Sequence, residues 1–126
     1  MTEKLQILIV DDDVMMTQTL VDIANKKGFE AIAACSGMEG LAIARHRKID
    51  ILLTDIKMPD MNGVELYLQV KEFQPGIKAI LMTAYSAEKL IEKGLAVGVS
   101  VVLTKPVAID FLITIYKVYQ RMLASL

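Results

Sequence analysis

The stretch LQILIVDDDV (residues 5–14) joins a run of apolar, strand-forming residues directly to three consecutive aspartates. An apolar run of this length is typical of a strand that is buried on both faces of a parallel sheet. In such sheets, ligands bind beyond the carboxyl ends of the strands. The stretch therefore predicts a buried first strand whose carboxyl end opens into an acidic site.

Four further apolar segments follow, and the hydrophobic period between them changes toward that of a helix. These segments are FEAIAAC (29–35), IDILLT (49–54), KAILMT (78–83) and VVLT (101–104). A strand and a helix that alternate five times predict an α/β fold, with a doubly wound five-stranded parallel sheet and five helices. No linker and no low-complexity run interrupts the pattern, so residues 1–126 are expected to form one domain.

The segment boundaries carry helix signals that agree with this alternation. Gly28 follows the first helical segment and is expected to stop it. Ser36 and Glu39 have the pattern of a capping box, and Asn62 and Ser86 are candidate N-caps of the third and fourth helices.

The composition excludes several functional classes. Fourteen Lys and Arg residues against fifteen Asp and Glu residues give a net charge of -1, so no global charge attracts nucleic acid or a membrane. The single Cys35 excludes an internal disulfide, and the N-terminus lacks the apolar core of a signal peptide. The apolar segment 107–126 is interrupted by Asp110, Lys117 and Arg121, which makes it too polar for a membrane span. We expect a cytoplasmic domain.

Polar residues follow the strands in a pattern that indicates phosphoryl chemistry. With strand order 2-1-3-4-5, the ends of the first and third strands meet, which brings Asp11 and Asp12 beside Asp55. Two carboxylates at about 4 Å repel by roughly 4 kcal/mol at an effective dielectric constant near 20, so a cation is required. A hard divalent ion such as Mg²⁺, together with Lys105, would supply it. A metal, an ammonium group and the hydroxyl of Thr83 are also what a transferring phosphoryl group needs.

The motifs ILIVDDD, LLTDIKMPDMNG, LMTAYS and VLTKP occur in this order, and with them the whole chain resembles the receiver domain of two-component response regulators. The resemblance implies a flavodoxin-like fold. It implies that Asp55 accepts a phosphoryl group from a sensor histidine kinase or a phosphotransfer protein, and that Thr83 and Lys105 contact the phosphoryl oxygens. Such a domain changes its own state and turns over no substrate, so it is not an enzyme in the usual sense.

The same resemblance implies a magnesium site. Asp12, Asp55 and the backbone carbonyl of Lys57 would bind Mg²⁺ directly, and Asp11 would act mainly through metal-bound water. Asp13 is expected only to begin a helix, where an acidic residue is favourable.

A second family has a related pattern. Haloacid-dehalogenase-like phosphatases place a nucleophilic aspartate after the first strand in a DxD motif, which Asp11 and Asp13 satisfy. That family also needs a later acidic pair, whereas here only Asp110 follows Lys105. Asp11 as the nucleophile of a phosphatase is therefore the more distant alternative.

Two arrangements of the protein remain open. It is either a stand-alone receiver or the first domain of a longer DNA-binding or enzymatic regulator. The end at Leu126 inside a helical pattern favours the second. The signalling face is expected on the fourth helix, fifth strand and fifth helix, although Val102 stands where the family usually has an aromatic residue. An apolar stripe on the last helix predicts a homodimer or an output partner, and it consists of Phe111, Ile115, Val118 and Met122.

Overall fold

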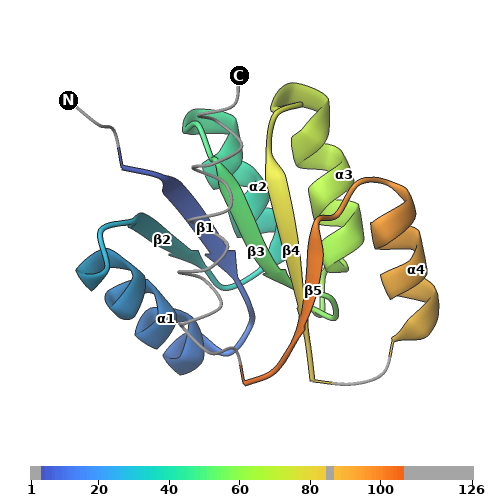
Figure 1. Cartoon of the computed structure of the whole chain (residues 1–126), viewed down its shortest axis with the longest axis horizontal. Coiled ribbons are helices and arrows are strands. Elements are labelled where there is room, and N and C mark those ends of the chain that lie inside the picture. Colours follow the sequence, from blue (N-terminus) through green and yellow to red (C-terminus); the bar gives the residue numbers. More distant parts are fainter. Residues whose placement is uncertain (1–3, 85–86, 107–126) are drawn as a thin grey trace.

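The computed structural model describes residues 4–84 and 87–106. Its strands are β1 (Gln6–Val10), β2 (Glu30–Ala34), β3 (Ile51–Asp55), β4 (Lys78–Thr83) and β5 (Val101–Thr104). Its helices are α1 (Val14–Lys26), α2 (Gly37–His46), α3 (Gly63–Phe73) and α4 (Glu88–Ala96). All strands are parallel in the order β2-β1-β3-β4-β5 (Figure 1), which confirms the predicted fold and strand order. The predicted fifth helix lies outside the described residues.

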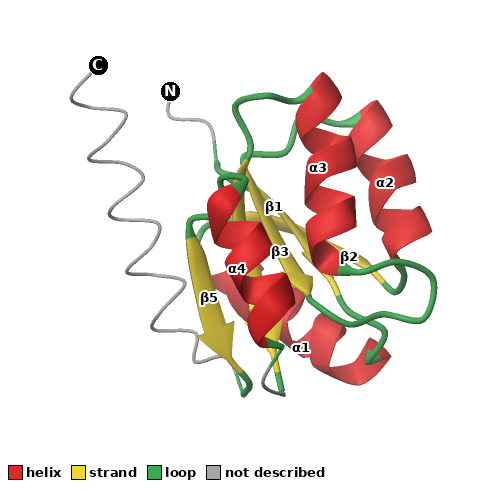
Figure 2. Ribbon diagram, turned by 90° about the vertical axis from the view of Figure 1, so that its right-hand side faces the viewer, coloured by secondary structure: helices red, strands yellow, loops and turns green. Residues whose placement is uncertain are grey.

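The sheet is buried on both faces, which explains the unbroken apolar runs in its sequence. Neighbouring residues of a strand point to opposite faces. Leu8 and Val10 pack into the cluster that contains side chains of α2, α3 and α4, whereas Ile7 and Ile9 pack into the cluster that contains side chains of α1. Figure 2 shows α2 and α3 side by side along the sheet.

The helices of the described residues begin largely as the sequence predicts. Ser36 accepts a hydrogen bond from the Glu39 N–H at 3.1 Å, and Asn62 accepts one from the Glu65 N–H at 2.9 Å. The capping box of α2 is only half formed, because the Glu39 carboxylate accepts from the N–H of Cys35 at 3.3 Å instead of from Ser36. The prediction of Ser86 as the cap of α4 is wrong by one residue, because α4 begins at Glu88 and Ala87 occupies the cap position; Ser86 itself lies outside the described residues.

The end of α1 confirms the predicted stop at Gly28. Gly28 has a φ of 100°, a left-handed conformation that glycine adopts without steric cost. Its N–H donates to the Asn25 carbonyl at 3.2 Å, and the next N–H, from Phe29, donates to Ala24 at 3.1 Å. This pair of bonds is a Schellman motif, which turns the chain into β2.

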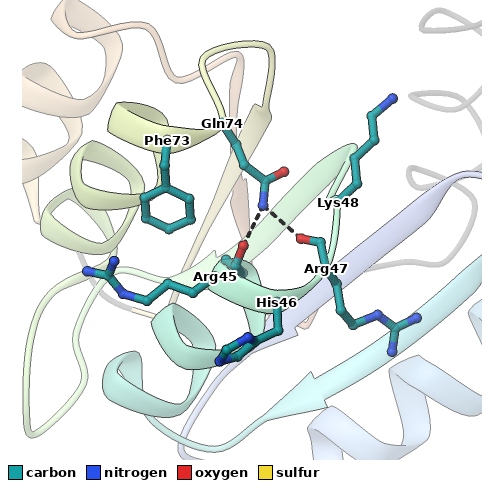
Figure 3. Close-up of a pocket in the computed structure, with 7 residues that line it drawn as sticks. Arg45, His46, Arg47, Lys48, Phe73 and Gln74 are labelled. Atoms are coloured by element: carbon teal, nitrogen blue, oxygen red, sulfur yellow. Dashed lines mark hydrogen bonds between the residues drawn. The ribbon is translucent and has the colours of Figure 1, made fainter.

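A single side chain, Gln74, fastens the end of α2 to the end of α3 (Figure 3). Its amide nitrogen donates to the carbonyls of Ala44 and Arg47 at 2.7 and 2.8 Å. Its amide oxygen accepts from the N–H of Ile49 at 2.8 Å. Gln74 thereby satisfies backbone groups that the helix end leaves without intrahelical partners.

Replacement of Gln74 by alanine is expected to lower the free energy of unfolding by about 2 kcal/mol, because the two half-buried hydrogen bonds contribute roughly 1 kcal/mol each and the exposed one, to Arg47, adds little. Urea denaturation measures the change. Gln18→Ala is the matched control, since Gln18 is exposed and, among the described residues, its side chain donates to Asp22 alone, at 2.9 Å. The control should stay within about 0.5 kcal/mol of the wild type. Equal stability of the two variants would contradict this role of Gln74.

Among the described helices, none is both long enough and apolar enough to cross a membrane.

Candidate functional site

The carboxyl ends of four strands converge on one depression of about 280 Å³. Asp11 directly follows β1, Asp55 ends β3, Thr83 ends β4, and Lys105 directly follows β5. Parallel pairing holds these ends level, since Val10 is opposite Thr54 and Thr83 is opposite Thr104. The depression is lined by every residue of the predicted site, namely Asp11, Asp12, Asp55, Lys57, Thr83 and Lys105, and also by Asp13 and Ala84.

The Lys105 ammonium group lies between two buried carboxylates. Its Nζ is 2.5 Å from Oδ2 of Asp11 and 3.0 Å from Oδ2 of Asp55. The exposed fractions of the side chains are 1% for Asp11, 12% for Asp55 and 17% for Lys105. Water therefore screens these charges weakly, and one ammonium group faces two carboxylates.

Burial raises the pKa of Asp55 above its ordinary value, and the nearby charge of Asp11 adds to the rise. The hydrogen bond from Lys105 opposes this rise without cancelling it. For Lys105, burial acts to lower the pKa, but the hydrogen bonds and charges of Asp11 and Asp55 raise it above the ordinary value. Lys105 therefore stays charged at neutral pH.

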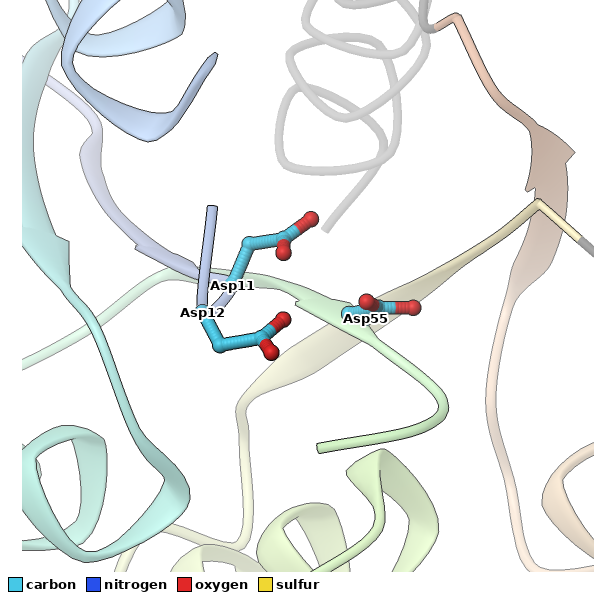
Figure 4. A group of neighbouring side chains, drawn as sticks. All are labelled: Asp11, Asp12 and Asp55. Atoms are coloured by element: carbon cyan, nitrogen blue, oxygen red, sulfur yellow. The ribbon is translucent and has the colours of Figure 1, made fainter. Parts of the chain in front are cut away.

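Asp11, Asp12 and Asp55 form a group that fits a metal ion (Figure 4). One carboxylate oxygen from each lies within 4.8 Å of the other two. Oδ1 of Asp11 accepts from the Asp13 N–H at 3.0 Å, whereas its buried Oδ2 faces the Lys105 ammonium group at 2.5 Å. An all-oxygen set with excess negative charge suits a hard divalent cation such as Mg²⁺.

Asp13 has a different position from the other two aspartates. Its side chain accepts a hydrogen bond from the N–H of Met16 at 3.0 Å and caps α1, as the sequence predicts. Asp12 is exposed at the mouth of the depression, whereas Asp11 is fully buried. The three consecutive aspartates thus have three different environments.

Two buried threonines that the sequence did not single out hold the acidic residues in place. The hydroxyl of Thr17 lies 2.6 Å from the carbonyl oxygen of Asp13 and 3.2 Å from that of Asp11. The hydroxyl of Thr54 donates to the carbonyl of Asp55 at 3.0 Å. The only local signal for Thr17 is its position four residues after the helix cap, where a hydroxyl can bond back to the preceding turn.

The loop after Asp55 turns closely back on the strand end. The N–H of Gly63 donates to the carbonyl of Ile56 at 2.8 Å. A Cβ atom at Gly63 would lie 2.4 Å from the carbonyl oxygen of Asp55, so a side chain there would displace the strand end. Glycine at this position lets α3 begin directly against the acidic site.

The raised pKa of Asp55 predicts a pH-dependent stability cost. A carboxyl group whose folded-state pKa is raised binds its proton more tightly in the folded state, so stability falls as pH rises from about 4 through the raised pKa. Asp55→Asn removes this loss. Without a divalent ion, the variant should therefore gain stability relative to the wild type across this window, as measured by thermal unfolding at several pH values. A constant difference between the two proteins across the window would contradict the assignment.

Comparison with known proteins gives one consistent result. The family model described as response regulator receiver domain matches residues 7–117. A response regulator receiver protein of Anaeromyxobacter is 40% identical over 102 residues, which cover 81% of this chain and 43% of that protein. Sporulation initiation phosphotransferase F of Bacillus subtilis is 34% identical over 110 residues, which cover 87% of each chain.

Other matches are longer proteins or solved structures. The transcriptional regulatory protein GlrR of Escherichia coli is 33% identical over 106 residues, but this chain spans only 24% of its length. The crystal structure of a CheY-like receiver domain protein from Methanospirillum hungatei superposes with a TM-score of 0.90 at 31% identity, and it covers 98% of this chain and 99% of that one. Similarity therefore extends over sequence and fold together.

Proposed function

Because this chain belongs to the response regulator receiver domain family of two-component signal transduction, we propose that it is a switch controlled by phosphorylation of Asp55. The observation that carries the proposal is the position of the Lys105 ammonium group against both Asp55 and buried Asp11. Thr83 lines the same depression. An acceptor carboxylate, a cation and a hydroxyl group are thus assembled in one place.

The phosphoryl group is proposed to come from a phosphohistidine of a sensor histidine kinase or a phosphotransfer protein. An oxygen of the Asp55 carboxylate forms the new bond to phosphorus, the phosphorus–nitrogen bond breaks, and its electron pair stays on the imidazole. Lys105 and Thr83 would then contact the phosphoryl oxygens and stabilise their charge. The domain modifies itself and releases no product of its own.

Mg²⁺ would be held by Asp11, Asp12, Asp55 and the backbone carbonyl of Lys57, with Asp11 acting mainly through bound water. When bound, it supplies positive charge that offsets the repulsion among the carboxylates and the incoming phosphoryl group. Three carboxylates within 4.8 Å of one another, two of them buried, support this assignment.

Phosphorylation is proposed to change the face formed by α4, β5 and the helix expected after β5. An aspartyl phosphate brings about 1.5 to 2 negative charges, which compete with Asp11 for Lys105. Lys105 is also linked to β4, since its N–H donates to the carbonyl of Thr83 at 2.9 Å. Lys105 also directly follows β5, so a shift of Lys105 would reach both strands.

The structure of α4 fits such a movement. Ala87 at its cap position forms no side-chain cap hydrogen bond, and of the helix residues Glu88–Ala96 only Gly94 is buried. A helix with so few buried side chains is held weakly and can shift at low cost. Val102 of β5 packs partly buried against the core on the same side, in the place where an aromatic residue is usual. We propose that the movement of α4 replaces the coupling that this aromatic normally provides.

The output has two candidate arrangements, and we propose a cytoplasmic location for either of them. The phosphotransferase of Bacillus subtilis is matched over most of its length, whereas GlrR has further regions beyond the match. A stand-alone receiver and a domain of a longer regulator are thus both represented. Self-association or output binding through Phe111, Ile115, Val118 and Met122 stays a prediction, because these residues lie outside the described part of the chain.

Acetyl phosphate with and without Mg²⁺ tests the proposed function on the purified protein. Intact-protein mass spectrometry should detect one added phosphate with Mg²⁺ and none with a chelator. The phosphatase alternative predicts instead that the protein hydrolyses a phosphomonoester with steady turnover. Asp11→Asn would abolish this turnover, and Asp55→Asn would leave it intact. That result would replace the receiver proposal.

A further inference from the structure

Asp60 joins the loop that follows Asp55 to the start of α2. Its Oδ2 accepts a hydrogen bond from the N–H of Met38 at 2.8 Å, and its Oδ1 accepts one from the N–H of Gly37 at 3.1 Å. The bond from Met38, followed by that from Gly37, lowers the pKa of Asp60 below its ordinary value. An ionised Asp60 thus holds two N–H groups in the first turn of α2, where negative charge is favourable.

The rest of the loop has few other polar connections. Ile56, just before it, donates its N–H to Met82 at 2.9 Å and accepts from Gly63 at 2.8 Å. Within the part of the chain that the structure describes, no backbone–backbone hydrogen bond joins residues 57–61 to the fold. The backbone of Lys57 forms a hydrogen bond with the Asp55 carboxylate, and Asp60 forms the side-chain hydrogen bonds that tie the far part of the loop to α2.

An apolar contact lies beside this polar one. A Cβ atom at Gly37 would lie 2.2 Å from Cγ of Met61, so the Met61 side chain rests directly on the glycine backbone. Met61 is partly buried and packs against the core. Asp60 and Met61 together hold the loop against the start of α2. Lys57 belongs to the same loop, only three residues before Asp60.

We infer that Asp60 is a positioning residue, which sets the affinity of the acidic site for Mg²⁺ by fixing the loop that carries Lys57. The inference rests on the proposed function, because it takes the Lys57 carbonyl as a metal ligand. Asp60 is exposed at the loop surface and is separate from the group of Asp11, Asp12 and Asp55. Its effect is therefore transmitted through the backbone of residues 57–60.

Ser36 provides a matched control, because it caps the same end of α2 and its hydroxyl bonds within the helix, to Glu39. Its hydroxyl accepts from the N–H of Glu39 at 3.1 Å. Asp60→Ala and Ser36→Ala both remove side-chain hydrogen bonds from the first turn of α2, and both should lower the midpoint of thermal unfolding. Only Asp60→Ala releases the loop.

Calorimetric titration of the full chain with Mg²⁺ alone distinguishes the two roles. Asp60→Ala is expected to raise the dissociation constant about tenfold, the lower end of what loss of a residue supporting a metal ligand costs. Ser36→Ala should leave the dissociation constant within about twofold of the wild type, since its loss acts on α2 only. Equal dissociation constants for wild type and Asp60→Ala would overturn the inference, and so would equal weakening in both variants.

A second variant keeps the test decisive if Asp60→Ala does not fold. Asp60→Asn retains one acceptor oxygen, so it should fold and weaken Mg²⁺ binding less than the alanine change does. An unchanged dissociation constant in this variant would then overturn the inference. Failure of the proposed function can be distinguished from failure of this inference, because the wild type itself would then bind no Mg²⁺ and take no phosphate from acetyl phosphate. In that case the inference falls with it.

Discussion

Asp55→Asn is expected to reduce phosphate incorporation to background under conditions in which the wild type gains one phosphate. The amide lacks the anionic oxygen that forms the bond to phosphorus. Two of the neighbouring carboxylates, those of Asp11 and Asp13, already have other contacts. Asp11 is buried and contacts Lys105 at 2.5 Å, and Asp13 is engaged in capping α1. Intact-protein mass spectrometry after treatment with acetyl phosphate and Mg²⁺ measures the loss.

Asp22→Asn is the control for this change. Asp22 lies on α1 in an exposed position and accepts only from Gln18 among the hydrogen bonds of the described residues. The control should take one phosphate as the wild type does. Full incorporation in Asp55→Asn would mean that another residue is the acceptor.

Lys105→Met is expected to lower the free energy of unfolding by roughly 3 kcal/mol in the absence of divalent ions, because it removes the cation from a buried ion pair. Two carboxylates, with side chains 1% and 12% exposed, would lose the ammonium group that lies within 3.0 Å of both. The methionine side chain keeps most of the volume, so the loss reflects charge and not a cavity. Urea denaturation in the presence of a chelator measures it.

Two controls separate charge from packing in this experiment. Lys89→Met changes an exposed lysine of α4 and should shift stability by less than about 0.5 kcal/mol. Addition of Mg²⁺ should recover part of the stability of Lys105→Met, since a divalent ion offsets the same repulsion. Unchanged stability of Lys105→Met without Mg²⁺ would show that the buried carboxylates do not depend on Lys105.

The sequence was sufficient to predict the sheet and the strand-end residues that meet in the acidic depression, because both follow from local patterns and one topological rule, whereas Lys57 was predicted only through the resemblance to receiver domains. Apolar runs mark the strands, and parallel pairing brings their carboxyl ends to one edge. Asp11, Asp55, Thr83 and Lys105 then meet because each stands at the end of a strand. No knowledge of side-chain packing was needed for that step.

The supporting contacts could not be predicted in the same way. Asp60 bonds to Met38 across 22 residues, and Gln74 bonds to Ala44 across 30. Such side-chain contacts with distant backbone depend on how α2 and α3 pack together, and no periodicity or short motif encodes this. The cap at Ser36 was predictable because its partner, Glu39, is three residues away.

The most direct test of the whole account is to locate the phosphate on the chain. Borohydride reduction of the phosphorylated protein converts an aspartyl phosphate to homoserine, which survives digestion and can be placed by peptide mass spectrometry. Trypsin separates the candidates, since Asp11, Asp12 and Asp13 fall in residues 5–26 and Asp55 falls in residues 49–57. If Asp55 is the acceptor, homoserine is expected at position 55 alone. Homoserine at position 11, with Asp55 unmodified, would contradict it.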